Sequence, residues 1–191
     1  MTLDAELDGI LEFLRTAERL KATPRSGWTT AGERESVAAH TWRLCLMTAV
    51  LADCFPDIDL ARLLKMCLIH DLGEALHGDI PAPEQSADSG KAARERADLA
   101  TVLAPLPARI RSEFTALWEE YEAATTPEAQ LAKGLDKLET ILQHTQGKNP
   151  ADFDYAFNLG YGRAYTSAHP LLAVIRARLD QATQARADKS R

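Results

Sequence analysis

Residues 63–80 read LLKMCLIHDLGEALHGDI, and this stretch decides the fold that the sequence predicts. Its apolar side chains recur at helical spacing, at Leu63, Leu64, Cys67 and Leu68. The run ends in the adjacent polar pair His70-Asp71, and an irregular segment rich in glycine and proline follows over 73–83. We therefore predict a helix from about residue 59 to this pair, followed by a loop of the kind that often carries chemistry.

On both sides of this stretch the chain reads as helices separated by turns. Ser36 is a suitable N-cap for the helix before it, and Thr126-Pro127-Glu128 combines a cap, a proline and an acid at the start of a later one. A loop is expected over 22–35, and no segment shows the alternation typical of a strand. The predicted helices cover residues 3–21, 36–54, 59–71, 90–104, 107–124, 126–146 and 152–159, with a last one from about 169.

Length and composition agree with an all-α protein. The 191 residues suit one domain, expected over 1–180, with a polar and frayed tail over 181–191. Aromatic residues make up only 6% of the chain, whereas alanine and leucine, which lose little freedom in a helix, are abundant. These features predict a soluble helical bundle.

Charge and cysteine content narrow the class of function. A net charge of −6 repels the phosphates of nucleic acid, so a nucleic-acid partner is not expected. A phosphorylated metabolite would need a local positive site, such as a metal ion or a few arginines. The cysteines Cys45, Cys54 and Cys67 form no CxxC pair, and neither a signal peptide nor a membrane-spanning run is recognised. We expect a cytoplasmic protein with no membrane partner.

Four residues from three predicted helices form a candidate metal site: His40, His70, Asp71 and Asp136. They supply two imidazoles and two carboxylates, a set that suits divalent transition metals and does not single out one of them. Facing helices of a bundle are a common way to assemble such a site. Asp136 stands on an apolar helical face among Leu131, Leu135, Leu138 and Leu142, so it either faces solvent or is buried for a reason.

Longer motifs surround these residues. In order they are Pro24-Arg25-Ser26-Gly27-Trp28, Glu35-Ser36-Val37-x-x-His40, His70-Asp71-x-x-Glu74-x-x-x-Gly78-Asp79-Ile80 and Leu135-Asp136-Lys137-Leu138-Glu139. Together they resemble the YfbR-type HD-domain 5'-deoxynucleotidases, over most of the chain. The resemblance implies an HD-domain helical bundle, a homodimer and an enzyme that hydrolyses deoxynucleoside 5'-monophosphates, a small-molecule substrate, to nucleoside and phosphate.

The resemblance also implies a role for each matching residue. One divalent metal ion would be bound by His40, His70, Asp71 and Asp136. Glu74 would position or activate the attacking water, Asp79 would contact the sugar, Arg25 would bind the phosphate and Trp28 would shape the nucleoside end. The chemistry is consistent, because a bound metal lowers the pKa of its water and arginine binds phosphate oxygens as a fork.

Other positions are less specific. Arg43 lies three residues past His40 on the same predicted helical face, so it is a further phosphate candidate. Two positions depart from the family pattern: Ala39 replaces a residue that is often acidic or polar, and the segment 81–85, PAPEQ, lacks a basic residue. These departures affect the expected affinity and substrate preference and leave the predicted metal site intact.

Simpler interpretations remain open at this stage. Arg25 and Arg43 could be surface charges, Asp79 a turn residue and Trp28 loop packing, while His77, His144 and His169 are interpreted as structural. The alternatives for the whole protein are another HD phosphohydrolase, acting on a triphosphate, a cyclic nucleotide or another phosphomonoester, or a non-catalytic metal-binding scaffold. The intact Glu74 and Asp79 argue against the scaffold.

Overall fold

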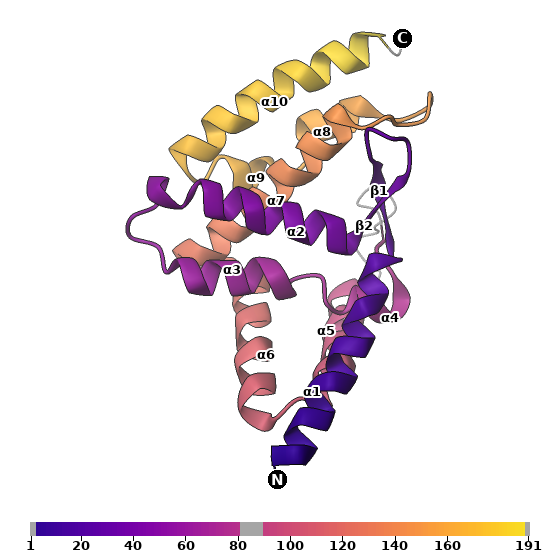
Figure 1. The fold of residues 1–191 in the computed structure, drawn as a ribbon. Coiled ribbons are helices and arrows are strands. Elements are labelled where there is room, and N and C mark those ends of the chain that lie inside the picture. Colours follow the sequence, from indigo (N-terminus) through magenta and orange to yellow (C-terminus); the bar gives the residue numbers. More distant parts are fainter. Residues whose placement is uncertain (1–2, 81–89, 190–191) are drawn as a thin grey trace.

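The computed structural model describes residues 3–80 and 90–189, which form ten α-helices and one two-stranded antiparallel sheet (Figure 1). Short 3-10 helices occupy Glu18–Lys21 and Ala52–Cys54. The helices are α1 (Leu3–Ala17), α2 (Val37–Val50), α3 (Leu60–Ile69), α4 (Glu74–His77), α5 (Lys91–Leu103), α6 (Ala108–Ala123), α7 (Pro127–Gln146), α8 (Tyr155–Gly160), α9 (Arg163–Thr166) and α10 (Pro170–Lys189). The predicted helical fold class is confirmed.

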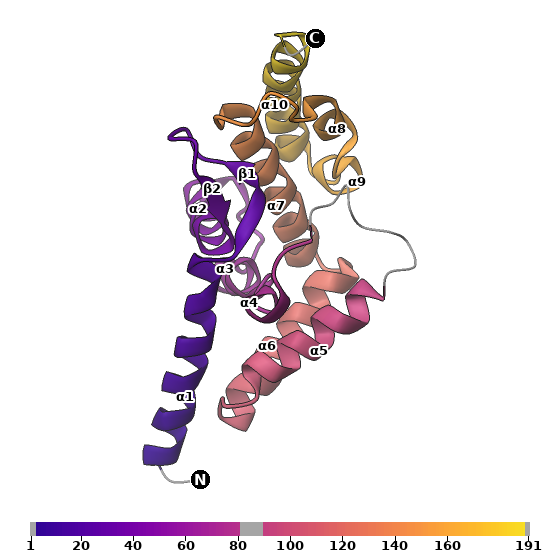
Figure 2. The ribbon, with the colours of Figure 1, turned by 90° about the vertical axis from the view of Figure 1, so that its right-hand side faces the viewer.

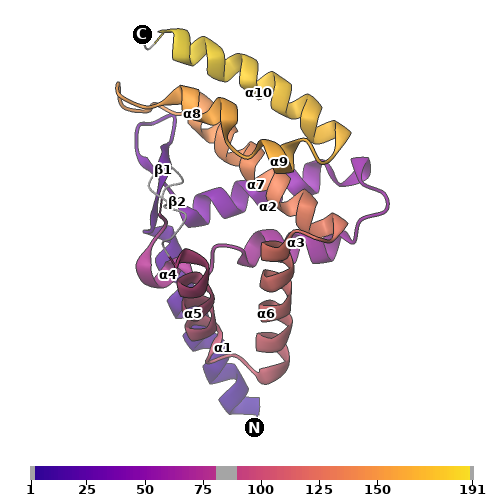
Figure 3. The ribbon, with the colours of Figure 1, turned by 180° about the vertical axis from the view of Figure 1, so that it is seen from behind.

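Helix α7 is the central element of the bundle. It packs against α2, α3, α6, α9 and α10, and Figure 3 shows it running between α10 on one side and α2 and α3 on the other. Its start follows the prediction, because the Thr126 side chain accepts a hydrogen bond from the Ala129 amide and Pro127 is the first helical residue. Buried residues occur along its whole length, so α7 can present polar groups to the interior at several levels.

Helix α2, which carries His40, also begins as predicted. The Ser36 hydroxyl accepts a hydrogen bond from the Ala39 amide and caps α2. Buried leucines, with Met66 and Trp118, join α2, α3, α5, α6 and α7 into one hydrophobic core. Figure 2 shows α1 on one side of the lower half and α5 and α6 on the other. This core fixes the helices that carry the candidate ligands.

Residues 22–35 were expected to be a loop, and that expectation was wrong. The segment contains strand β1 (Pro24–Trp28), which pairs antiparallel with β2 (Arg34–Ser36) and joins Pro24 to Ser36 and Trp28 to Arg34. Contacts from outside the hairpin stabilise it, since Gln143 Nε2 donates to the Trp28 carbonyl oxygen at 2.5 Å. A strand of five residues supported by such contacts carries too little alternation to be read from sequence.

The expected frayed tail over 181–191 was also wrong for the part that the structure describes. Helix α10 continues to Lys189. Thr183 and Ala187 are buried, and the Arg186 guanidinium donates to the carbonyl oxygens of Thr145 and Gly147. Polar composition hid these contacts, because a helix that packs through alanine and threonine has no strong apolar stripe.

The irregular segment after the candidate pair contains one short helix, α4, and a turn. Gly78 has φ +82°, a conformation that disfavours side chains, and it redirects the chain toward Asp79. The departure expected over 81–85 lies outside the described residues. Within the described ranges, no helix combines the length and apolar character needed to cross a lipid bilayer.

Candidate metal centre and adjoining cavity

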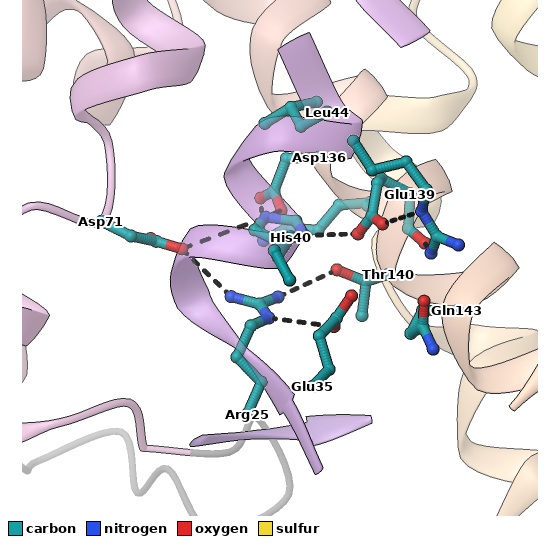
Figure 4. Close-up of polar contacts among 12 residues, drawn as sticks. Arg25, Glu35, His40, Leu44, Asp71, Asp136, Glu139, Thr140 and Gln143 are labelled. Carbon is teal, nitrogen blue, oxygen red and sulfur yellow. Dashed lines mark hydrogen bonds and ion pairs between the residues drawn. The ribbon is translucent and has the colours of Figure 1, made fainter. Parts of the chain in front are cut away.

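Three elements bring the four predicted ligands to one point. Figure 4 shows His40, Asp71 and Asp136 at this point. His40 comes from α2, His70 and Asp71 directly follow α3, and Asp136 comes from the middle of α7. His40 Nε2 lies 3.2 Å from Asp136 Oδ1, and His70 Nε2 lies 3.0 Å from Asp71 Oδ2. The two crossed distances, from His40 to Asp71 and from His70 to Asp136, are both 4.0 Å. The four side chains therefore converge on one small volume.

The two imidazoles meet a simple test for metal binding. Nε2 of His40 and Nε2 of His70 are both buried, and neither has a hydrogen-bond partner among the described residues. Buried polar atoms normally have partners, so two unpartnered nitrogens facing two carboxylates require an explanation. Nitrogen and carboxylate oxygen together form a donor set that divalent transition metals accept. His40, His70 and Asp71 also lie close enough together to coordinate one ion.

The opposite nitrogens of the two rings fix their orientation. His40 Nδ1 contacts a Glu139 carboxylate oxygen, and His70 Nδ1 lies 2.8 Å from the Cys67 carbonyl oxygen. Both partners can only accept a hydrogen bond, so the proton of each ring belongs on Nδ1. Nε2 is then the ring nitrogen left to face the centre, which is the arrangement found in metal-binding histidines.

Sequence reasoning missed the role of Glu139. This side chain is fully buried, and its second oxygen accepts a hydrogen bond from Arg43 Nε at 2.6 Å. Burial opposes ionisation of Glu139, but His40 and Arg43 outweigh it and lower its pKa. Arg43, predicted as a phosphate ligand, is instead paired with Glu139 and is not among the described residues that line the cavity. The spacing of Glu139 three residues after Asp136 was the available signal.

Asp136 is held from both sides. The Tyr121 hydroxyl donates to its Oδ2 at 3.0 Å and Lys137 Nζ donates to the same oxygen at 2.8 Å, which leaves Oδ1 toward His40. Burial alone would raise the pKa of Asp136, but Lys137 and His40 keep it well below its usual range. These two cationic neighbours therefore favour the ionised form of Asp136.

Arg25 reaches the centre from strand β1. Its Nη1 donates to Asp71 Oδ2 at 3.0 Å, its Nη2 to the Thr140 hydroxyl at 3.2 Å, and its Nε lies 3.7 Å from a Glu35 oxygen. Burial opposes ionisation of Asp71, yet His70 and Arg25 hold its pKa below its ordinary value. The hairpin that was not predicted therefore brings a largely buried guanidinium to the candidate metal centre.

Glu74 lies at the start of α4 and lines the same cavity. Its Oε2 is buried, with no hydrogen-bond partner among the described residues. Burial, followed by the nearby charges of Asp71 and Asp79, raises the pKa of Glu74 to about 10. A carboxyl in this environment binds a proton strongly and is a candidate for proton transfer.

The cavity has a volume of about 840 Å³. Trp28 and Asp79 line it, as do Arg25, Glu74 and the predicted ligands His70, Asp71 and Asp136. Its wall also contains Ser26, Thr140, His144, Phe153, Phe157, Asn158 and Tyr161. This volume lies within the range of small-molecule sites, roughly 300–1,000 Å³. The predicted metal, phosphate, sugar and nucleoside residues therefore line one cavity, with the exceptions of Arg43 and of His40, which lies behind the cavity wall and contacts Asp136.

The three histidines interpreted as structural lie in different places. His77 Nδ1 is 2.9 Å from an Asp98 oxygen, and His169 packs edge-on against Phe55. His144, by contrast, belongs to the cavity wall. Its place in the cavity is not visible in the sequence, where it stands two helical turns after Asp136.

Comparison with known proteins agrees with this arrangement. A family model described as HD domain matches residues 17–175. The 5'-deoxynucleotidase HDDC2 of Danio rerio is 35% identical over 139 residues, which cover 72% of this chain and 68% of the relative. The 5'-deoxynucleotidase hdd1 of Schizosaccharomyces pombe is 37% identical over 140 residues, with 70% of each chain covered.

A solved structure extends the similarity to the fold. The crystal structure of a predicted metal-dependent phosphohydrolase from Magnetospirillum magnetotacticum superposes with a TM-score of 0.79 at 28% sequence identity. The alignment covers 94% of this chain and 96% of that one. The helical arrangement around the four converging side chains is thus shared over nearly the whole chain.

Proposed function

The chain belongs to the HD domain family, and on that premise we propose that it is a metal-dependent 5'-deoxynucleotidase. It hydrolyses deoxynucleoside 5'-monophosphates to nucleoside and phosphate. The observation that carries this proposal is the convergence of His40, His70, Asp71 and Asp136 beside a cavity that Arg25 and Glu74 also line.

His40, His70, Asp71 and Asp136 would hold one divalent metal ion, whose identity the donor set leaves open. Such an ion supplies Lewis-acid polarisation of a phosphoryl oxygen and lowers the pKa of water. The protein contributes the orientation of both imidazoles, through the hydrogen-bond acceptors at Nδ1, and two carboxylates kept ionised by neighbouring cations.

The remaining residues bind the substrate and handle its proton. Arg25 offers a guanidinium to the phosphate oxygens, and its contacts with Asp71 and Thr140 hold it beside the metal ligands. A divalent cation held at the centre would lower the pKa of Glu74 again, and its carboxylate is placed to take the proton from the attacking water and pass it on to the leaving 5'-oxygen. Asp79 would contact the sugar, and Trp28 would shape the nucleoside end of the cavity.

The test is hydrolysis of a substrate panel by the purified protein with Co²⁺ or Mn²⁺ bound. The panel contains deoxy- and ribonucleoside 5'-monophosphates, a deoxynucleoside triphosphate, a cyclic nucleotide and p-nitrophenyl phosphate. We expect phosphate release to be fastest from the deoxynucleoside monophosphates. If none of the monophosphates releases phosphate while metal analysis shows a loaded site, the proposal is wrong.

Glu74→Gln separates catalysis from metal binding. Loss of the proton-accepting carboxylate is expected to lower kcat by roughly 10²–10⁴-fold, the usual contribution of general acid–base catalysis. Metal content should stay unchanged, because Glu74 is not one of the four converging ligands. Full activity of this variant would show that another group handles the proton.

We also propose that the protein is a homodimer in the cytoplasm. Trp42, Leu46 and Val50 are exposed and recur every four residues along α2, which gives that helix an apolar outer face. All three cysteines are free, which suits a reducing compartment. Light scattering after size exclusion tests the dimer, and a monomeric mass at micromolar concentration would refute it. Fractionation of cells that express the protein tests the compartment.

A further inference from the structure

His144 uses both of its ring nitrogens in the cavity wall. Nδ1 lies 3.0 Å from Asn158 Oδ1, and Nε2 lies 3.2 Å from the Ser26 hydroxyl oxygen. The ring also packs edge-on against Phe153, with 5.0 Å between centroids. All four of these residues line the cavity, and the proposed metal chemistry uses none of them.

These contacts decide which nitrogen of His144 carries the proton. The amide oxygen of Asn158 can only accept, so the proton of a neutral ring lies on Nδ1. Burial lowers the pKa of His144, which favours the neutral ring at physiological pH. Nε2 is then an acceptor, and the Ser26 hydroxyl must donate to it.

The Ser26 hydroxyl can therefore act toward a ligand only as a hydrogen-bond acceptor. Because its only proton is directed at His144, the hydroxyl oxygen can offer lone pairs alone to the cavity. A substrate group that meets Ser26 must be a hydrogen-bond donor. An acceptor at the same place would face the oxygen without a proton between them, at the cost of an unpaired polar contact.

The position of His144 along α7 places this acceptor away from the reacting phosphate. His144 follows Asp136 by eight residues, and the helical rise of about 1.5 Å per residue separates them by roughly 12 Å along the axis. Ser26 is also the residue between Arg25, which reaches the metal centre, and the Gly27-Trp28 end of β1. The Ser26–His144–Asn158 chain thus stands at the end of the cavity where the base of a nucleotide would lie.

We propose that Ser26 is a specificity-determining residue that accepts a hydrogen bond from an exocyclic amino group of the base, and that His144 is the positioning residue that sets its polarity. This inference rests on the proposed nucleotidase function. Adenine, cytosine and guanine carry such an amino group, whereas thymine and uracil present oxygen acceptors instead. The cavity accordingly favours the amino-bearing deoxynucleotides.

The matched substrates dCMP and dUMP test this proposal, because they differ at ring position 4 by an amino group against an oxygen. We expect the wild-type protein to give a higher kcat/KM for dCMP. Ser26→Ala should reduce the dCMP to dUMP ratio by roughly three- to tenfold, the effect of one hydrogen bond. Ser167→Ala is the control, since its hydroxyl donates to the Arg163 carbonyl oxygen and Ser167 is exposed.

His144→Phe tests the positioning role separately. It keeps a ring against Phe153 but frees the Ser26 proton, so Ser26 can then donate to an oxygen. The variant should therefore raise kcat/KM for dUMP relative to dCMP, and adding Ser26→Ala should abolish that gain. Hydrolysis of p-nitrophenyl phosphate, which has no base, should be the same in the wild type and in the Ser167→Ala control. Ser26→Ala alone still tests the acceptor if His144→Phe does not fold.

The outcomes separate this inference from the proposed function. If the loaded wild-type protein hydrolyses no deoxynucleoside monophosphate, the proposed function is wrong. If it hydrolyses them and Ser26→Ala leaves the dCMP to dUMP ratio unchanged, the nucleotidase stands and the role of Ser26 is refuted. A ratio that changes in Ser26→Ala and stays unchanged in His144→Phe would refute the positioning role of His144.

Discussion

At the scale of single residues, His40 connects two different environments. One ring nitrogen faces the carboxylates Asp71 and Asp136, and the other contacts Glu139 in a fully buried pair. Arg43 balances the charge of Glu139 from the other side. The nitrogen of His40 that faces the proposed metal centre is therefore oriented by Glu139, which does not itself face that centre.

Glu139→Gln should weaken metal binding by about 10- to 100-fold, the usual cost of losing a group that orients a metal-binding histidine. The amide keeps the size of the carboxylate but no longer guarantees an acceptor at His40 Nδ1. The measurement is the dissociation constant for Co²⁺ alone, by calorimetry on the metal-free protein.

Glu113→Gln is the control for this experiment, because Glu113 is an exposed partner of Lys65 far from α7 in sequence. Its affinity for Co²⁺ should equal that of the wild type. Equal affinities for all three proteins would show that the contact with Glu139 is only structural.

Much of the candidate site could be predicted at this scale, for a chemical reason. Histidine and aspartate at the motif positions have few other uses in an apolar helical context, so the four ligands were expected together. The ion-pair partner of Arg43 was not predictable, because Arg43 has the same spacing from His40 whether it faces a phosphate or Glu139. His144 was likewise interpreted as structural, because sequence spacing does not show which helix face borders a cavity.

At the scale of elements, the packing of α7 against α10 requires the two helices to lie close together at Gly134. A Cβ added to Gly134 of α7 would overlap the Leu172 side chain of α10 and would lie 3.1 Å from the Tyr165 carbonyl oxygen. Leu172 is fully buried and the backbone at Tyr165 cannot easily move. Gly134 is therefore needed for packing within a helix where alanine would otherwise be preferred.

Gly134→Ala should destabilise the fold by roughly 1–3 kcal/mol, the cost of overpacking a filled interior. Gly160→Ala is the matched control, since a Cβ there meets no atom within 4 Å. Urea unfolding followed by circular dichroism gives both values. A Gly134→Ala protein as stable as the control would mean that α10 shifts without cost.

The starts of helices were more predictable from sequence than the contacts between segments distant in sequence. Ser36 and Thr126 cap α2 and α7 as expected, because capping depends only on local hydrogen bonds. The β1–β2 hairpin depends on Gln143, and Arg186 at the end of α10 depends on the carbonyl oxygen of Thr145, and both partners are distant in sequence. Local pattern cannot report such contacts, and both elements were therefore missed.

At the scale of the whole molecule, the proposed metal site should make the stability of the folded state depend on metal. The unfolded chain has no preformed arrangement of His40, His70, Asp71 and Asp136, so a metal ion binds the folded state far better. Adding Co²⁺ at about 100 times its dissociation constant should stabilise the protein by roughly 2.7 kcal/mol, or about 5–10 °C in Tm. Differential scanning calorimetry with and without chelator measures this, and an unchanged Tm would contradict a folded-state site.

The three thiols should report unfolding at different levels. Cys54 is exposed, whereas Cys67 is buried in the core, and burial raises the pKa of Cys67 to about 12. Ellman's reagent should modify Cys54 rapidly and Cys67 only when the core opens. The rate of Cys67 modification should therefore follow the free energy of global unfolding across a urea series. Cys54→Ser isolates the slow phase. Rapid reaction of Cys67 in native buffer would show that the core opens locally.

The volume and aromatic lining of the cavity have a practical consequence for the design of an activity assay. At about 840 Å³ it lies toward the upper end of the range for small-molecule sites, and aromatic side chains such as Trp28, Phe153 and Phe157 line it. Rings of that kind stack on flat heterocycles. A deoxynucleotide whose base is a fluorescent bicycle should therefore be accepted as a substrate. The fluorescence of the base would change when the nucleoside product leaves the aromatic wall. Turnover could therefore be followed continuously by fluorescence, without detecting phosphate.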